Sequence, residues 1–166
     1  DRSPARLEAV ERAAGRLGAT IVRTLAADAS RPMELGDMPP AGFDAVLLDA
    51  PCTGLGVLRR TPDIKLRRTE GDIKRSSELQ GELLANLSAS VARGGRLVYS
   101  VCTFEPEETD EVVDAFLSTH RDFSAEDARG CLPPACGPLV DEGGRLRTMP
   151  HRGGMDGFFA ARLRRN

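Results

Sequence analysis

Two short apolar runs, each followed by a chemically reactive group, stand out in the hydrophobic pattern of the chain. Residues 43–48 (FDAVLL) are mostly apolar and lead directly to Asp49. The run is too short for a typical helix and predicts a buried central strand. Residues 96–101 (RLVYSV) follow Gly94 and Gly95, predict a second strand, and lead directly to Cys102.

Three other segments carry apolar residues at helical spacing. They predict helices over residues 4–17, over residues 76–91 and from Pro106 onward. Pro4 suits the first position of the first helix, and Gly18 suits its end. Glu107 and Glu108, close behind Pro106, suit the positive end of a helix dipole.

The remaining segments complete a pattern in which strands alternate with helices. We expect a strand over residues 20–26, connections over 31–42, 54–72 and 131–144, and a closing antiparallel hairpin of 145–149 with 157–164. Strands separated by helices favour a mostly parallel sheet with right-handed crossovers. The hairpin would add an antiparallel edge, so the predicted fold class is α/β.

Composition narrows the class of protein. The 166 residues suffice for one domain with a real core, and 40% hydrophobic with 29% charged residues is ordinary for a globular protein. No apolar run is long enough to span a membrane. The cysteines show no CxxC spacing, which indicates free thiols in a cytosolic protein and no metal site. Nothing here predicts the oligomeric state.

The two strand ends define the candidate site. Asp49, Pro51 and Cys52 follow the first strand, and Cys102 follows the second. Ligands of open α/β sheets bind outside the carboxyl ends of the strands. If the two strands are parallel neighbours, both thiols emerge at one edge of the sheet, and this convergence is the central prediction.

Two motifs that contain these residues resemble those of a known family. DAPCTGLGVLRRTPDIK (residues 49–65) and YSVCTFEPEETDEVV (residues 99–113) are similar to the catalytic motifs of RNA cytosine-5 methyltransferases. The similarity is closest to the bacterial Sun/Fmu type, which methylates small-subunit ribosomal RNA. It extends over nearly the whole chain, from DRSPARLEAV at residues 1–10 to GMDGFFAARL at residues 154–163.

The resemblance implies a Rossmann-like methyltransferase fold with S-adenosylmethionine as cofactor. By motif match, Asp1 would bind the ribose hydroxyls, Asp28 would lie near the adenine, and Asp49 and Pro51 would face the cofactor, Asp49 also facing the target base. Cys102 matches the family's nucleophile. Cys52 matches the second cysteine, which releases the enzyme from its product.

One departure from the family concerns the start of the chain. The family's first strand, its Gly-rich cofactor loop and any N-terminal RNA-binding domain would precede Asp1. We therefore expect residues 1–166 to be an N-terminally truncated, partial catalytic domain that binds the cofactor poorly and is inactive by itself. The activity would belong to the longer protein.

Spacing alone does not decide which thiol attacks. Both Cys52 and Cys102 follow strands, and DNA cytosine methyltransferases attack through a Pro-Cys motif like that of Pro51 and Cys52. The resemblance to the RNA branch favours Cys102. A thiolate that adds at C6 of cytosine makes C5 nucleophilic, which is covalent catalysis.

Charge beside the first motif indicates RNA as the partner. Residues 59–75 hold seven basic and three acidic residues, a local excess of four positive charges in a chain of net charge −2. Arg59, Arg60 and Lys65 are the predicted phosphate contacts. Two alternatives stay open: a non-catalytic RNA-binding or assembly module with the same fold, and a thiol–disulfide switch through Cys52 and Cys102.

Overall fold

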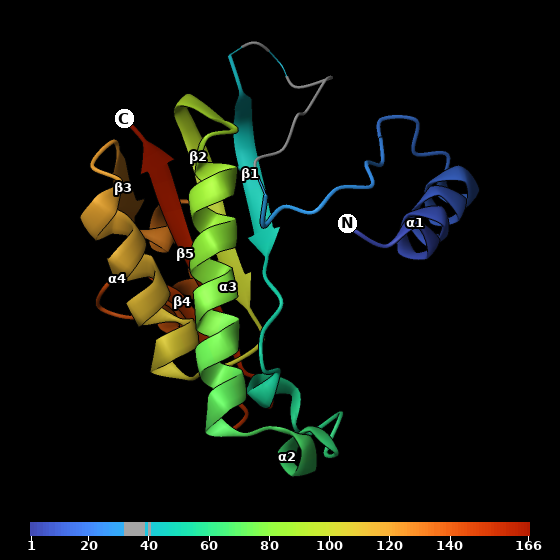
Figure 1. Ribbon diagram of the computed structural model, residues 1–166. Coiled ribbons are helices and arrows are strands. Elements are labelled where there is room, and N and C mark those ends of the chain that lie inside the picture. Colours follow the sequence, from blue (N-terminus) through green and yellow to red (C-terminus); the bar gives the residue numbers. More distant parts are fainter. Residues whose placement is uncertain (32–38, 40) are drawn as a thin grey trace. The chain divides into compact units, whose positions relative to one another are not determined.

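The computed structural model describes residues 1–31, 39 and 41–166, and it contains two compact units, Asp1–Gly36 and Asp37–Asn166 (Figure 1). The predicted connection over residues 31–42 falls largely outside the described residues. That residues 1–166 form part of one catalytic domain stays a prediction.

The first unit contains the helix α1 (Pro4–Leu17), as predicted. Pro4 lies in its first turn, where the missing backbone N–H removes no hydrogen bond. Gly18 ends the helix in the left-handed conformation, with φ of 66°. The N–H groups of Gly18 and Ala19 then donate to the carbonyls of Gly15 and Ala14.

The strand predicted over residues 20–26 is wrong, because this segment has irregular backbone. A strand needs a neighbouring strand for its backbone groups. Here Leu25 and Ala27 exchange only two hydrogen bonds with the backbone of Asp1. The large apolar side chains of the segment are exposed to solvent, and Ile21 is 91% exposed.

The second unit is built on the parallel pair β1 (Phe43–Asp49) and β2 (Val91–Val101), which confirms both predicted strands. The central, buried position predicted for β1 is wrong. In the strand order β1-β2-β5-β3 it lies at the edge, and Leu47 is 69% exposed. Among the described residues, only β2 pairs with it.

Residues before the predicted second strand also belong to β2. Gly94 and Gly95 lie within the strand, where the pairing shifts from Phe43 opposite Val91 to Ala45 opposite Arg96. Extra residues on one strand form a bulge, and Gly94 takes the left-handed φ of 76° there. The two glycines therefore lie at a bulge within the strand and do not precede it.

The C-terminal strand β5 (Phe158–Arg165) pairs antiparallel with β2, β3 (Phe123–Glu126) and β4 (Leu146–Thr148). Since β1 runs parallel to β2, four strands share one direction and β5 alone runs opposite. This confirms the mostly parallel α/β sheet with a C-terminal hairpin, formed by β4 and β5. The hairpin is no simple edge, however, because β5 lies between β2 and β3.

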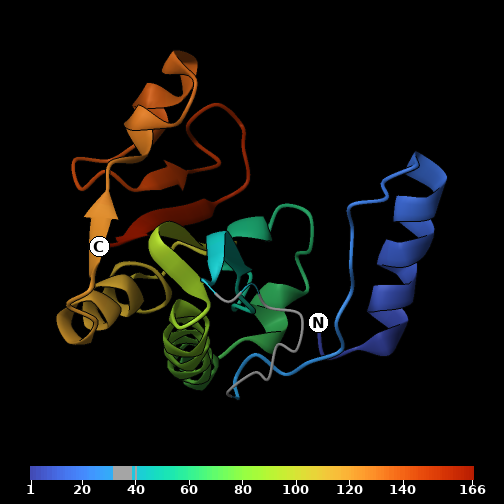
Figure 2. The same ribbon diagram turned by 90° about the horizontal axis from the view of Figure 1, so that it is seen from above.

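The helices α3 (Glu70–Ser88) and α4 (Asp110–Thr119) lie on the same face of the sheet, as Figure 2 shows. Between them and the strands is the core. Its fully buried apolar residues include Leu84, Leu97, Tyr99, Val101, Val113, Phe159 and Leu163. No helix in the described part of the chain is both long and apolar enough to cross a membrane.

The boundaries of α3 differ from the prediction. The helix begins at Glu70 instead of residue 76, because Thr69 and Asp72 form a capping box. It ends at Ser88, since β2 begins at Val91. The predicted 54–72 loop therefore contains the first turn of α3, the short helix α2 (Ile64–Arg67) and a 3-10 turn, Leu55–Val57.

The helix predicted from Pro106 is divided in two. A 3-10 turn, Pro106–Glu108, is followed by a break at Thr109, whose ψ is −93°, and α4 begins at Asp110. The predicted 131–144 loop is irregular apart from a 3-10 segment, Pro134–Leu139.

We expect Leu97→Ala to lower the free energy of unfolding by about 2–5 kcal/mol, because the side chain is fully buried in β2 and its loss leaves a cavity. The matched control is Leu47→Ala on the exposed part of β1, with an expected change within about 0.5 kcal/mol. Urea unfolding followed by circular dichroism measures both values. Equal losses in the two variants would contradict the core assigned here.

Candidate active site

The parallel pairing of β1 and β2 brings the two reactive cysteines together. Asp49 stands opposite Ser100, and the N–H of Ala50 donates to the Ser100 carbonyl at 2.9 Å. Beyond these residues, the segments that follow β1 and β2 both leave the sheet at the carboxyl ends of the strands. The Sγ atoms of Cys52 and Cys102 lie 3.2 Å apart, within hydrogen-bond range, so the predicted convergence is confirmed.

Asp49 lies at the same end of the sheet. Its Oδ1 accepts a hydrogen bond from the Ser100 hydroxyl at 3.3 Å, while the residue as a whole is exposed. The neighbouring Ala50 is buried. An exposed carboxylate on an anchored backbone is suited to contact a ligand.

Both cysteines are free thiols, and their shared hydrogen bond makes them different. The hydrogen bond from Cys52 lowers the pKa of Cys102 to about 7, against the raising effects of burial and of the Asp49 and Glu108 charges. The same hydrogen bond, together with burial, raises the pKa of Cys52. At neutral pH the arrangement favours a Cys102 thiolate that accepts a hydrogen bond from the Cys52 thiol.

A buried polar network lies behind the thiols. The carboxylate of Glu108 accepts hydrogen bonds from the Thr53 N–H at 2.9 Å, from the Thr53 hydroxyl, and from Gln80 Nε2 at 2.9 Å. The hydroxyls of Thr53 and Thr103, the residues that follow the two cysteines, lie 3.3 Å apart. All four side chains belong to fully buried residues.

Close backbone contacts fix the loop after Cys52. The N–H of Gly56 donates to the Cys102 carbonyl at 3.0 Å, and the N–H of Gly157 donates to the Gly56 carbonyl at 2.8 Å. A Cβ atom at Gly56 would lie 2.0 Å from the Gly157 oxygen. Only glycine fits here, so three distant segments meet at this residue.

Comparison with known proteins identifies the family. Residues 1–164 match the family described as 16S rRNA methyltransferase RsmB/F. The chain belongs to this family. A probable ribosomal RNA small subunit methyltransferase B from Bacillus subtilis is 39% identical over 161 residues, and the methyltransferase B from Thermus thermophilus is 41% identical over 166 residues. The resemblance to bacterial ribosomal-RNA methyltransferases is thereby confirmed.

The RsmB/F chain covers only part of these relatives. The matches span 96% and 99% of the chain but 35% and 38% of the two relatives. A solved structure of NSun6 from Pyrococcus horikoshii with SFG matches 99% of the chain and 40% of its own, with a TM-score of 0.82 and 32% identity. A methyltransferase homolog from the same organism gives a TM-score of 0.77 at 30% identity, over 100% of the chain and 52% of its own. These likenesses confirm the Rossmann-like methyltransferase fold.

The two other predicted cofactor acids of the RsmB/F chain belong to its first unit. Asp1 Oδ1 accepts the Ser3 N–H at 2.7 Å, and Asp28 Oδ1 accepts the N–H and hydroxyl of Ser30. The Ser30 hydrogen bonds lower the pKa of Asp28. Both acids are exposed, and their carboxylates are available as hydrogen-bond acceptors.

The predicted RNA contacts lie on the connection between Cys52 and α3. Arg59 and Arg60 form ion pairs with Asp156, at 3.4 and 2.6 Å, and Lys65 is exposed on α2. Because one carboxylate faces two guanidinium groups, the cluster keeps a net positive charge. Asp156 also precedes Gly157, so the basic cluster is attached to the contact at Gly56.

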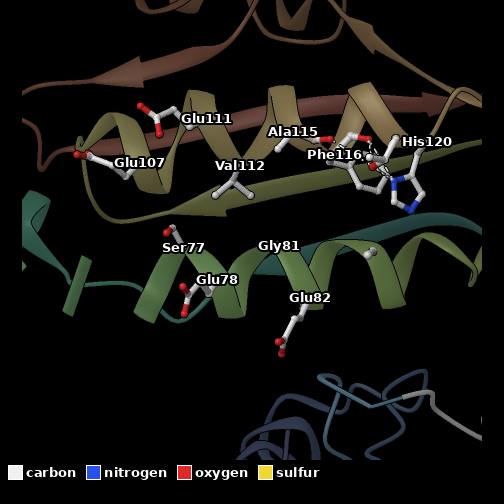
Figure 3. A pocket seen from close by; sticks show the side chains of 12 residues that line it. Ser77, Glu78, Gly81, Glu82, Glu107, Glu111, Val112, Ala115, Phe116 and His120 are labelled. Atoms are coloured by element: carbon white, nitrogen blue, oxygen red, sulfur yellow. Dashed lines mark hydrogen bonds between the residues drawn. The ribbon is translucent and has the colours of Figure 1, made fainter. Parts of the chain in front are cut away.

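A groove of about 470 Å³ between α3 and α4 is a separate feature (Figure 3). Glutamates line its rim and Val112 and Phe116 its floor, with His120 at one end. The His120 ring stacks on Phe116, with 4.1 Å between ring centroids. The groove contains neither cysteine nor Asp49, so it is not the candidate active site. Across the described part of the chain, no cluster of three or more His, Cys, Asp or Glu residues could hold a metal ion.

The sequence pattern does not predict the polar network. The position of Glu108 behind Pro106 suits a helix dipole, while in the structure the residue is fully buried. Two signals point to the network in hindsight. Each cysteine is followed by a threonine, and Gln80 interrupts the apolar face of α3 between Leu79 and Leu83.

We expect Cys102 to react with iodoacetamide with an apparent pKa near 7, because its hydrogen bond from Cys52 favours the thiolate. Cys52 should react slowly across the same pH range, since its pKa is raised. Peptide mass spectrometry after timed alkylation between pH 5.5 and 9 measures both rates. Preferential labelling of Cys52 at neutral pH would reverse the assignment.

We expect Gly56→Ala to cost about 1–3 kcal/mol of unfolding free energy, since the added methyl group meets the backbone of Gly157. Gly81→Ala in α3 is the control, because a Cβ there has no atom within 4 Å and alanine favours a helix. Urea denaturation compares the two. An unchanged unfolding free energy in Gly56→Ala would show that the backbone around Gly56 and Gly157 can move apart to admit the methyl group.

Proposed function

We propose that residues 1–166 are part of the catalytic domain of a cytoplasmic enzyme that methylates C5 of a cytosine in RNA, with small-subunit ribosomal RNA as the substrate. Membership of the RsmB/F family supports RNA methylation. The observation that carries the cytosine-5 assignment is the 3.2 Å pair of sulfur atoms with opposite pKa shifts.

Cys102 is the nucleophile in this proposal. Its thiolate forms a bond to C6 of the cytosine, which moves an electron pair toward C5 and makes that carbon nucleophilic. When bound, S-adenosylmethionine supplies an electrophilic methyl group for C5. Loss of the C5 proton to a base and cleavage of the bond between C6 and Cys102 Sγ then restore the aromatic ring.

Cys52 acts in the release step. Its raised pKa keeps the thiol protonated, and its position next to Cys102 lets it donate a hydrogen bond to that sulfur as it leaves C6 as a thiolate. Two thiols of equal pKa would not divide the roles in this way. The pKa difference supports the choice of Cys102, which spacing alone leaves open.

The carboxylates present fit S-adenosylmethionine. Ribose hydroxyls donate hydrogen bonds, and Asp1 and Asp28 offer acceptor oxygens. Asp49, at the end of β1, would contact the cofactor and the polar edge of the base, and Pro51 would line the same cofactor site. A carboxylate also suits the positive charge of a sulfonium group.

The basic cluster of Arg59, Arg60 and Lys65 would contact RNA phosphates beside the catalytic loop. The link of Asp156 to both arginines supports this role, because it orders two guanidinium groups next to the loop that carries Cys52. The target base must leave its stack or lie in a single strand for Cys102 to reach C6.

We expect Cys102→Ala in the full-length protein to abolish methyl transfer, because no thiolate remains to add at C6. Cys52→Ala should let a covalent RNA adduct accumulate, since the leaving Cys102 thiolate loses the hydrogen bond that stabilises it. Denaturing gels of each variant with ribosomal RNA measure the adduct as a shifted band. The double variant is the control and should give none; a band in Cys102→Ala and not in Cys52→Ala would exchange the two roles.

A further inference from the structure

A buried carboxylate holds the backbone on both sides of Cys52. Glu108 accepts two hydrogen bonds from Thr53, which follows Cys52, and one from Gln80. The same Gln80 Nε2 donates to the carbonyl of Pro51, which precedes Cys52, at 2.9 Å. One network therefore holds the cysteine from both sides.

The charge of Glu108 has no cation to balance it. The residue is fully buried, and no Lys or Arg among the described residues forms an ion pair with it. Burying a carboxylate on hydrogen bonds alone is unfavourable compared with an apolar side chain. Such a departure from ordinary packing is typical of a functional position.

Glu108 itself is firmly placed by the segment that carries the other thiol. It follows Cys102 on the chain, and its carbonyl accepts the Tyr99 hydroxyl at 2.7 Å. Cys102 directly follows the last residue of β2, a strand that pairs with neighbours on both sides. Cys52 lies beyond the end of the edge strand β1, so its position depends more on the network.

We propose that Glu108 is a positioning residue that acts through Thr53 to hold Cys52 beside Cys102. The proposal rests on the proposed function, because it serves the release step there. Loss of the link would leave Cys102 in place and move Cys52 away. The variant would then form the covalent adduct and release it slowly.

Substitutions can separate the link from the charge. Thr53→Val removes the hydroxyl and keeps the shape and the backbone N–H, and Thr53→Ser restores the hydroxyl. Glu108→Gln removes the charge but can keep every hydrogen bond, since its amide can donate to the Thr53 hydroxyl, which then donates to Thr103. Glu107→Gln is the matched control, because Glu107 is exposed and touches neither cysteine segment.

The first experiment uses the rate of disulfide formation between Cys52 and Cys102, without RNA, as a measure of how close the two thiols lie. Oxidised glutathione converts one thiolate of the full-length protein to a mixed disulfide, and the second thiol displaces glutathione. We expect Thr53→Val to slow this ring closure about tenfold, with wild-type rates in Thr53→Ser and Glu107→Gln. Closure in Thr53→Val at the wild-type rate would overturn the proposal.

Alkylation of Cys102 distinguishes positioning from general damage. Its alkylation profile in Thr53→Val should shift to higher pH, because Cys102 loses the hydrogen bond from Cys52, while the limiting rate at high pH stays at the wild-type value. An equal fall in this limiting rate and in ring closure indicates a disrupted fold and overturns the proposal. Glu108→Gln should shift the alkylation profile of Cys102 to lower pH, since the Glu108 charge raises the pKa of that thiol.

The second experiment uses ribosomal RNA. Thr53→Val should accumulate the covalent adduct as Cys52→Ala does, with kcat reduced about tenfold and KM unchanged. If Cys52→Ala accumulates adduct and Thr53→Val does not, the positioning role is wrong and the proposed function stands. If no variant forms an adduct, the proposed function is wrong, and the rate of ring closure still decides the positioning role.

Discussion

The register between β1 and β2 is the constraint on which the rest of the site depends. Asp49 stands opposite Ser100, so β1 and β2 end at the same level of the sheet. The sulfur atoms of two segments fifty residues apart therefore meet. A shift of one residue would turn every side chain of the shifted strand to the other face of the sheet. Asp49 and the two thiols would then no longer lie together at the carboxyl ends of β1 and β2.

Proximity changes the chemistry of the two cysteines. An isolated thiol has a pKa near ~8.5 and is mostly protonated at neutral pH. In this pair the proton of Cys52 stabilises the thiolate of Cys102, while Cys52 becomes harder to ionise. This difference is what the proposed division into a nucleophile and a residue that assists release rests on.

Much of the fold could be predicted from the sequence, because the decisive signals are local. The apolar runs at Phe43 and Arg96, the Pro4 helix start and the C-terminal hairpin all depend on short-range patterns. The same holds for the convergence of Cys52 and Cys102, once both strands are taken as parallel neighbours. The capping box of Thr69 and Asp72, which sets the start of α3, is a short-range pattern of the same kind.

Other features depend on contacts that short patterns do not contain. Residues 20–26 have the composition of a strand, but among the described residues no strand pairs with them, and the Leu25 carbonyl accepts its hydrogen bond from the N-terminal amine of Asp1. The edge position of β1 and the insertion of β5 between β2 and β3 are properties of the whole sheet. The burial of Glu108 depends on Thr53 and Gln80, which lie 55 and 28 residues away along the chain.

The contact between Gly56 and Gly157 has a consequence for how the protein is made. Synthesis runs from the N-terminus, so both cysteines leave the ribosome well before Gly157 does. Until then the loop after Cys52 lacks its last backbone partner, and β2 lacks the neighbour that β5 provides. Contacts of such large sequence separation form late and slowly. The site therefore becomes complete only when β5, which is made after both cysteine segments, has been inserted into the sheet, and this couples the appearance of the paired thiols to a late step of folding.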